Sequence, residues 1–84
     1  MKVSKELLSP HELGQTLQQG RLLKDLSQRE LAQKMDVSQK WIWEMEQGKP
    51  GILMERLFKM LKLTGVKLYA ELDLDTSPEE GQDD

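Results

Sequence analysis

The sequence predicts an all-α fold: a bundle of four to five short helices, followed by one C-terminal β-strand that pairs with its copy across a homodimer. Two observations lead to this prediction. At three places a serine precedes apolar residues spaced three or four apart, which is typical of capped amphipathic helices. After residue 65 the apolar period shortens to two, which is typical of a strand with one buried face.

The first helix is predicted from about Pro10 to Lys24. Ser9 is a suitable N-cap, and proline is favoured at the first helical position because its missing N–H would have no partner there. Leu13 and Leu17 lie one turn apart and form the predicted core face of this helix.

Two shorter helices are predicted within the stretch SQRELAQKMDVSQKWIWEME, residues 27–46. Ser27 and Glu30 can form a capping box at the first start, and Ser38 offers a second N-cap. Two capped helices joined by a tight turn form a helix-turn-helix. The predicted inward residues are Leu31, Ala32, Met35, Val37, Ile42 and Met45, and the predicted outward residues of the second helix are Gln39, Lys40, Trp43 and Glu44.

The same stretch resembles the helix-turn-helix of the lambdoid phage repressors and the Xre family of regulators related to them. The matching positions are Leu26-Ser27-Gln28, Glu30-Leu31-Ala32, Lys34, Val37-Ser38, Ile42, Glu46 and Gly48-Lys49. The resemblance implies a lambda-repressor-like bundle in which Arg21 pairs with Glu46 inside the fold. Asp25 and Asp36 stand where these relatives carry glycine, so both must adopt a left-handed conformation, which aspartate tolerates better than most residues. Gly20 costs the first helix about 1 kcal/mol relative to alanine.

A further helix is predicted from about Ile52 to Thr64, after a loop over residues 48–51. Its apolar stripe is Met54, Leu57, Phe58 and Leu61. Residues 66–74 then alternate as a strand, with Val66, Leu68, Ala70, Leu72 and Leu74 on one face. No other segment has this pattern, and a lone strand leaves its backbone groups unpaired, so we infer pairing with the same strand of a second copy. The alternative is a strand that packs against the helices of its own chain or frays.

This C-terminal part resembles the HipB branch, the antitoxins that accompany HipA-like kinase toxins, and the resemblance covers about residues 9–73. It implies a dimeric operator-binding repressor that also restrains a partner kinase. The domain organisation we predict is a lead-in (1–8), a helix-turn-helix domain (9–65), a dimerising strand (66–74) and a disordered acidic tail (75–84). The tail either aids solubility or docks on the toxin or another basic surface.

The charge distribution is compatible with DNA binding. The net charge is −3, but residues 1–70 carry twelve basic and eight acidic residues, which is a net +4. The chain has no cysteine and no apolar run near the roughly 20 residues of a membrane span, so we expect a soluble protein of the bacterial cytoplasm, associated with the nucleoid.

The resemblance and the chemistry of base edges nominate contacts on a double-stranded operator. Glutamine can bond adenine and lysine can bond guanine in the major groove. The predicted base contacts are Ser38, Gln39, Lys40 and Trp43, and the predicted phosphate contacts are Gln28, Arg29, Gln47 and Lys49. Trp41 and Trp43 occupy positions where the phage repressors carry small or polar residues, so this helix could instead bind a protein.

No enzyme activity, cofactor or metal site is predicted. His11 is the only histidine and no nucleophile or metal-ligand set surrounds it in sequence. Two other functions remain open besides the antitoxin: a stand-alone or phage-type repressor without a toxin, and a protein-interaction module that uses the tryptophan-bearing helix.

Overall fold

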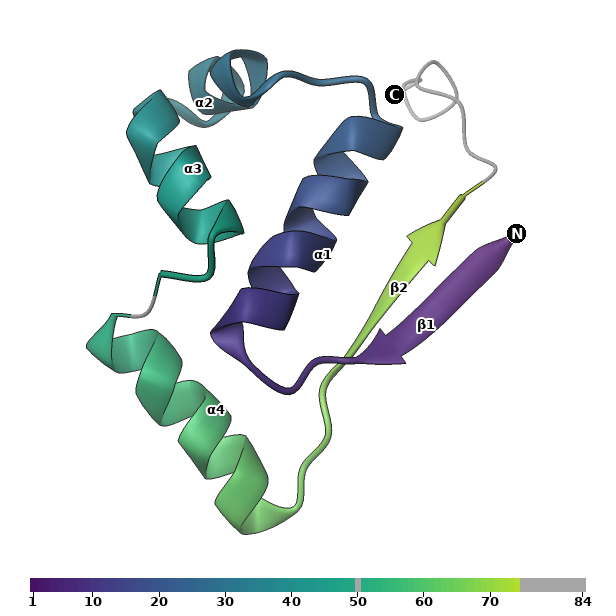
Figure 1. The fold of residues 1–84 in the computed structure, drawn as a ribbon, viewed down its shortest axis with the longest axis vertical. Coiled ribbons are helices and arrows are strands. Elements are labelled where there is room, and N and C mark those ends of the chain that lie inside the picture. The colour runs from purple at the N-terminus through teal and green to yellow at the C-terminus, as the bar shows by residue number, and fades with distance from the viewer. Residues whose placement is uncertain (50, 75–84) are drawn as a thin grey trace.

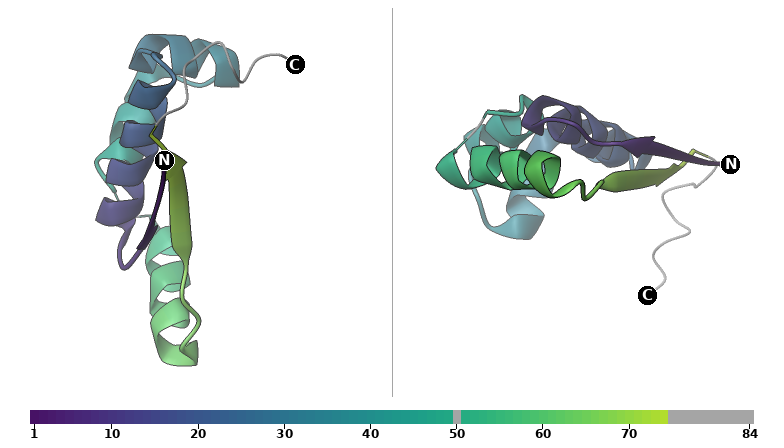
Figure 2. Two further views of the ribbon diagram at one scale, coloured as in Figure 1. Left: turned by 90° about the vertical axis from the view of Figure 1, so that its right-hand side faces the viewer. Right: turned by 90° about the horizontal axis from the view of Figure 1, so that it is seen from below.

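The computed structural model describes residues 1–49 and 51–74 and contains, over that range, four helices and a small antiparallel sheet (Figure 1). The order is β1 (Lys2–Glu6), α1 (Pro10–Leu23), α2 (Gln28–Met35), α3 (Gln39–Glu46), α4 (Ile52–Thr64) and β2 (Tyr69–Asp73). The strands lie on one side of α1, while α2 and α3 lie on the other (Figure 1). Helices α2 and α4 lie towards opposite ends of the long axis (Figure 2). The predicted tail, 75–84, is outside the described residues.

Each helix start that the serines predict is present. Ser27 Oγ accepts a hydrogen bond from the Glu30 N–H at 3.0 Å, and the Ser27 N–H donates to Glu30 Oε1 at 2.8 Å, which completes the capping box. The side chains of Ser9 and Ser38 cap α1 and α3 by accepting from the N–H groups of Glu12 and Trp41. The helices therefore begin where local hydrogen bonds satisfy their first N–H groups.

The two aspartates have the left-handed backbone that the sequence requires. Asp25 and Asp36 both have φ of 59°. Asp36 is the C-cap of α2, and the next N–H, that of Val37, donates to Ala32 O at 3.0 Å. This geometry turns the chain sharply into α3, which fixes the angle between the two helices.

Residues 2–6, within the predicted lead-in of residues 1–8, form β1. This strand pairs antiparallel with β2, from Lys2 opposite Asp73 to Glu6 opposite Tyr69. The inference that β2 is a lone strand is therefore wrong. β1 has one β-branched residue, Val3, and no clear apolar alternation, so its structure comes from pairing and not from its own pattern.

β2 is shorter than predicted, and Val66 and Leu68 lie before its first residue. The alternation itself is correct: Ala70 and Leu72 are half-buried, whereas their neighbours in the strand are exposed. Paired backbone continues past both ends of β2, since the Leu7 N–H donates to Leu68 O and the Leu74 N–H donates to Met1 O, each at 2.8 Å.

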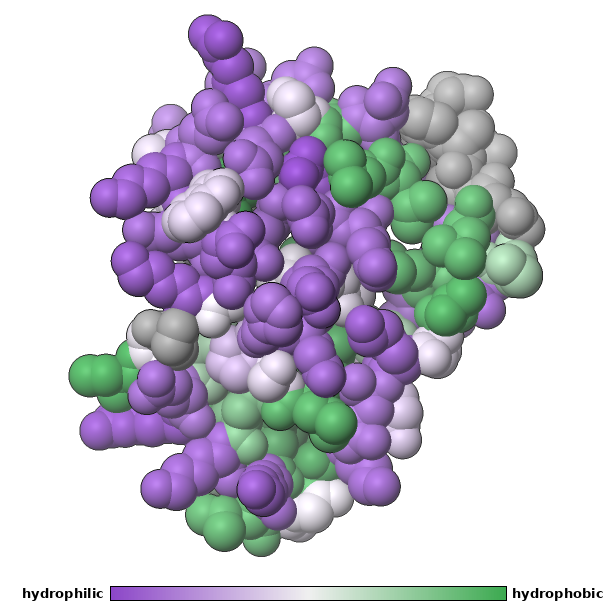
Figure 3. All heavy atoms as spheres, in the orientation of Figure 1, coloured by the Kyte–Doolittle hydropathy of each residue, from purple (hydrophilic) through white to green (hydrophobic). Residues whose placement is uncertain are grey.

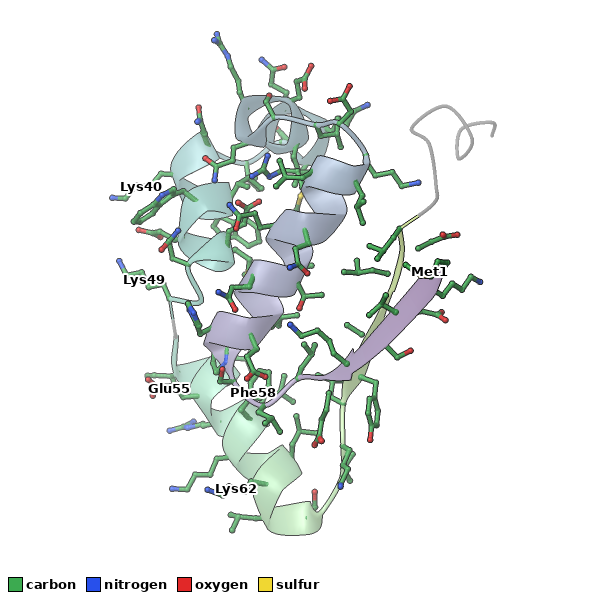
Figure 4. All side chains as sticks on the ribbon, turned by 45° about the vertical axis from the view of Figure 1, so that its right-hand side comes forward. Met1, Lys40, Lys49, Glu55, Phe58 and Lys62 are labelled. Carbon is green, nitrogen blue, oxygen red and sulfur yellow. The ribbon has the colours of Figure 1, made fainter. Side chains whose placement is uncertain are left out.

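The hydrophobic core of this chain is thin. Only Leu7, Ala32, Ile42 and Phe58 are buried among the described apolar residues. Among the helical residues predicted to pack inward, three are instead exposed, namely Leu17 (46%), Met35 (47%) and Leu57 (41%). Phe58 extends from α4 towards α1 (Figure 4) and is the main buried residue of that helix. The chain alone therefore leaves much apolar surface in contact with water.

This apolar surface is concentrated in particular places. The face over α2 and α3 is mostly hydrophilic, whereas hydrophobic residues gather on α4 and where the end of α1 approaches the strands (Figure 3). An open groove of about 640 Å³ also runs between α1, the helix-turn-helix and β2. Its apolar lining includes Leu13, Leu17, Leu31, Met35, Trp41 and Leu72.

Candidate nucleic-acid interface

A buried ion pair anchors the end of α3. Arg21 of α1 donates from Nε to Glu46 Oε2 at 2.6 Å and from a second guanidinium nitrogen to Oε1 at 3.0 Å. The side chains are 8% and 3% exposed. Arg21 also donates to Leu26 O at 2.8 Å, in the loop before α2. One guanidinium therefore joins α1, the α1–α2 loop and α3, and the two-pronged geometry fixes their relative orientation.

Gln28 belongs to the same cluster. Its Nε2 donates to Glu46 Oε1 at 3.0 Å, which connects the start of α2 to the end of α3. Sequence reasoning nominates this residue for phosphate contact, and the structure shows that its side chain also has an internal role. An N–H at the first turn of α2 and the second hydrogen of Nε2 are the groups that a phosphate would use.

The cluster keeps Glu46 ionised. Burial raises the pKa of the Glu46 carboxyl, but hydrogen bonds from Arg21 and Gln28, together with the charge of Arg21, outweigh it and leave the pKa below its ordinary value. The hydrogen bond and charge of Glu46 raise the pKa of Arg21 despite burial. Both groups are thus charged at neutral pH, and each needs the other because an unpaired buried charge is costly.

Two glycines allow α3 to lie close to α1. A Cβ at Gly14 would lie 2.5 Å from both Met45 O and Glu46 O. Gly48 follows α3 with φ of 71°, and a Cβ there would collide with the backbone of His11. These contacts set the position of α3. Sequence reasoning did not use Gly14, although an isolated glycine inside a helix is a signal of close backbone approach.

The outward face of α3 presents the nominated base contacts. Gln39 and Lys40 are exposed in its first turn, and Trp43 is 50% exposed one turn later. The cap residue Ser38 is also exposed, with its Oγ accepting from the Trp41 N–H at 3.0 Å. Ile42 and Glu46 form the buried side of the helix. By helical spacing Lys40 lies away from that side, whereas Gln39 and Trp43 lie nearer its border.

The nominated phosphate contacts other than Gln28 are exposed polar residues. Arg29 lies in the first turn of α2, and Gln47 is the C-cap of α3. Lys49 follows in the next loop and points to the same side of α3 as Lys40, away from the sheet (Figure 4). The structure thus brings the nominated groups onto the helix-turn-helix and its flanking loop.

Glu44 lies between the two lysines and was not nominated. Lys49 Nζ donates to Glu44 Oε2 at 3.2 Å, and Lys40 Nζ lies 4.0 Å from the same oxygen. The Glu44 side chain is 28% exposed, against 80% for Lys40 and 63% for Lys49. A carboxylate therefore lies among nominated contacts that are otherwise basic or neutral.

Trp41 occupies a different surface from Trp43. It is 42% exposed and lines the apolar groove beside Leu31 and Met35.

The described residues contain no group of three or more histidine, cysteine, aspartate or glutamate side chains placed to hold a metal ion. None of the helices in the described part of the chain is long and apolar enough to cross a membrane.

A family model described as helix-turn-helix domain matches residues 12–73, which is most of the chain. No curated protein and no solved structure matches. The matched range includes α1 from its third residue, the other three helices and β2, and so contains the Arg21–Glu46 cluster and the exposed face of α3. In such domains the second helix of the motif enters the major groove of DNA. By this match and its fold, the chain belongs to the helix-turn-helix domain family.

Proposed function

We propose that this protein is a sequence-specific transcriptional repressor that reads DNA with α3. The observation that carries the proposal is the exposed row of Gln39, Lys40 and Trp43, on a helix held from behind by the buried Arg21–Glu46 pair. A rigid helix with hydrogen-bonding groups on its outer face suits direct reading of base edges. Gln39 would bond an adenine and Lys40 a guanine.

Phosphate contacts would fix the register of α3 on the duplex. Gln28, Arg29, Gln47 and Lys49 lie at the start of α2 or just beyond α3, where helix N–H groups and positive charge attract phosphate oxygens. Ser38, at the N-cap of α3, would contact a base or a phosphate.

We also propose that the active species is a homodimer joined through β2. On either side of β2, the Leu68 carbonyl and the Leu74 N–H bond to residues that flank β1. Because the direction of backbone groups alternates along a strand, the N–H groups of Tyr69 and Glu71 point away from β1. Among the described residues the sheet has two strands only. A second copy of β2 at this outer edge would give a four-stranded sheet and satisfy those groups.

The apolar groove supports the same arrangement. Ala70, Glu71 and Leu72 border it, so a strand added at the outer edge of β2 would lie next to the groove and cover part of it. Exposed apolar surface of this extent in a small chain is typical of an interface. Two-fold symmetry would place the two copies of α3 about 34 Å apart, or a multiple, and the operator would be an inverted repeat.

The finer proposal is that the repressor is the antitoxin of a HipBA-type module, controlling its own operon and binding a HipA-like kinase. It rests on the resemblance of residues 9–73 to HipB, with Trp43 and the acidic tail as candidate contacts for the kinase. Co-purification of a kinase encoded beside this chain would support it, and a stable repressor with no such neighbour would make it a stand-alone or phage-type regulator.

The deciding experiment measures binding to a fragment of the chain's own promoter and to a random duplex of equal length, over a salt series. We expect preference for the promoter and affinity that falls steeply with salt. Gln39→Ala should weaken promoter binding by about 1–3 kcal/mol and leave random-duplex binding nearly unchanged.

Equal binding to both duplexes by an intact dimer would contradict direct reading by α3. The tryptophan-bearing helix would then be a protein-interaction surface.

A further inference from the structure

Glu44 is the least expected group on the outer face of α3. It belongs to the same row as Lys40, Trp43 and Gln47, since these positions lie three or four residues apart. Both neighbouring lysines contact one of its oxygens, Oε2. Within the described residues no donor contacts Oε1. The carboxylate is therefore held in place while keeping one oxygen for another donor.

A carboxylate in this position opposes general DNA binding in two ways. It repels phosphates, and it competes with them for Lys40 and Lys49. A residue that weakened all binding equally would serve no purpose in a repressor. A residue that weakens binding to the wrong sequences, and is satisfied by the right one, contributes specificity.

The major groove contains donors that can satisfy it. A carboxylate accepts a hydrogen bond from the N4 amino group of cytosine, whereas guanine and thymine present only acceptors at the corresponding edge. Adenine also presents an amino group, at N6, but its neighbouring N7 is an acceptor that repels the carboxylate. On a site with cytosine opposite Glu44, the amino group can bond the carboxylate, which frees Lys40 for a guanine and Lys49 for a phosphate. On other sites the carboxylate faces at least one acceptor, or it retains the lysines.

We propose that Glu44 is a specificity-determining residue, which selects a cytosine amino group in each half-site and restrains Lys40 and Lys49 on other DNA. This inference rests on the proposed repressor function. Glu44 would disfavour the wrong sequences, whereas Gln39 and Lys40 would favour the right one.

The test compares wild type with Glu44→Gln, which keeps the side-chain shape, adds a donor and removes the charge. We expect random-duplex affinity to rise and the ratio of promoter to random affinity to fall about tenfold. The logarithm of random-duplex affinity should fall more steeply with the logarithm of salt concentration, by the slope of about one to two added phosphate contacts, because two lysines are released. Site selection from a randomised duplex pool should enrich cytosine at one symmetric position with wild type and lose that enrichment with Glu44→Gln.

Glu6→Gln is the matched control. It removes the same charge from β1, on the other side of α1 from α3 (Figure 1), and should leave promoter preference and salt dependence unchanged. If the two variants behave alike, the effect is one of net charge and the inference is wrong. The inference is also wrong if wild type prefers its promoter and Glu44→Gln retains both that preference and the enrichment of cytosine. The repressor function would then still stand. Wild type without promoter preference would instead overturn the repressor function itself.

Discussion

Three donor groups from two residues surround the Glu46 carboxylate at the end of α3. Two come from Arg21 and one from Gln28, at distances of 2.6–3.0 Å. All buried side-chain polar atoms among the described residues have a hydrogen-bond partner. In a chain with so few buried apolar side chains, this cluster determines how α1, α2 and α3 fit together. Its removal should therefore affect both stability and the position of α3.

Glu46→Gln should destabilise the fold by about 3 kcal/mol, because it leaves the Arg21 charge buried without a counter-ion. Urea denaturation followed by tryptophan fluorescence would measure the loss. The double substitution Arg21→Met with Glu46→Leu, which replaces both charges by apolar groups, should recover most of it. A single variant as stable as wild type would show that the pair contributes little.

The pH dependence follows from the lowered pKa of Glu46. A carboxyl whose pKa is lower in the folded than in the unfolded state stabilises the fold above its unfolded pKa, and this stability is lost as pH falls through the folded pKa. Stability should therefore be constant near neutrality and fall in acid below about pH 4.5. The hydrogen bond from the Ser27 backbone N–H lowers the pKa of the exposed Glu30 carboxyl. Protonation of Glu30 should therefore add a smaller loss of stability in acid. The Arg21→Met, Glu46→Leu variant should show a shallower fall in the same titration.

Among the elements, α1 contains two glycines with opposite roles. Gly14 permits the close approach of α3, whereas a Cβ at Gly20 would lie at an ordinary contact distance of 3.7 Å from Leu72 Cδ2. One glycine is required by packing, and the other only lowers helix propensity. The two positions therefore provide a matched pair of Gly→Ala substitutions within one helix.

Gly20→Ala should stabilise the fold by about 0.5–1 kcal/mol, from the gain in helix propensity. Gly14→Ala should destabilise it by about 1–3 kcal/mol, because the added methyl group meets two backbone oxygens of α3. In thermal melts, Gly20→Ala should raise and Gly14→Ala should lower the melting temperature, by about 4–8 °C per kcal/mol. Shifts of the same sign would show that α1 and α3 are not packed as described. Gly14→Ala should also weaken DNA binding, since it displaces α3.

At the scale of the whole molecule, the exposed apolar surface is the main feature. Leu53, Met60 and Leu63 of α4 are 83%, 66% and 77% exposed, and the groove beside α1 is open. A stable chain of this size needs more burial than these contacts provide, and a second copy is the simplest source.

Glu71→Pro tests the proposed dimer, because it removes an N–H that points to the outer edge of β2 and leaves the bonds to β1 in place. We expect the dimer measured by sedimentation equilibrium to dissociate at least tenfold more readily. Glu71→Ala, which removes the same carboxylate and keeps the N–H, should remain dimeric. Equal dimerisation of the two variants would place the interface elsewhere, for example on α4.

The sequence determined the helices of this protein by itself. Ser9, Ser27 and Ser38 cap helices through bonds to residues three positions away, and Asp36 turns the chain within one residue, so the motif is encoded locally. The apolar alternation of β2 is equally local. The exposed face of α3 followed from the helical period, and the resemblance supplied the nominated DNA contacts and the pairing of Arg21 with Glu46.

Only the tertiary structure decided the rest. Residues 2–6 form a strand because the edge of β2 offers hydrogen-bond partners for their backbone. No apolar periodicity within residues 2–6 predicts this strand. Gln28 joined the buried cluster and Gly14 became a contact point because α2 and α3 fold back towards α1. Leu17, Met35 and Leu57 have the spacing of core residues yet stay exposed, since burial requires a surface to pack against and the single chain does not supply one. Periodicity shows which face of a helix is apolar, but only the three-dimensional arrangement decides what covers it.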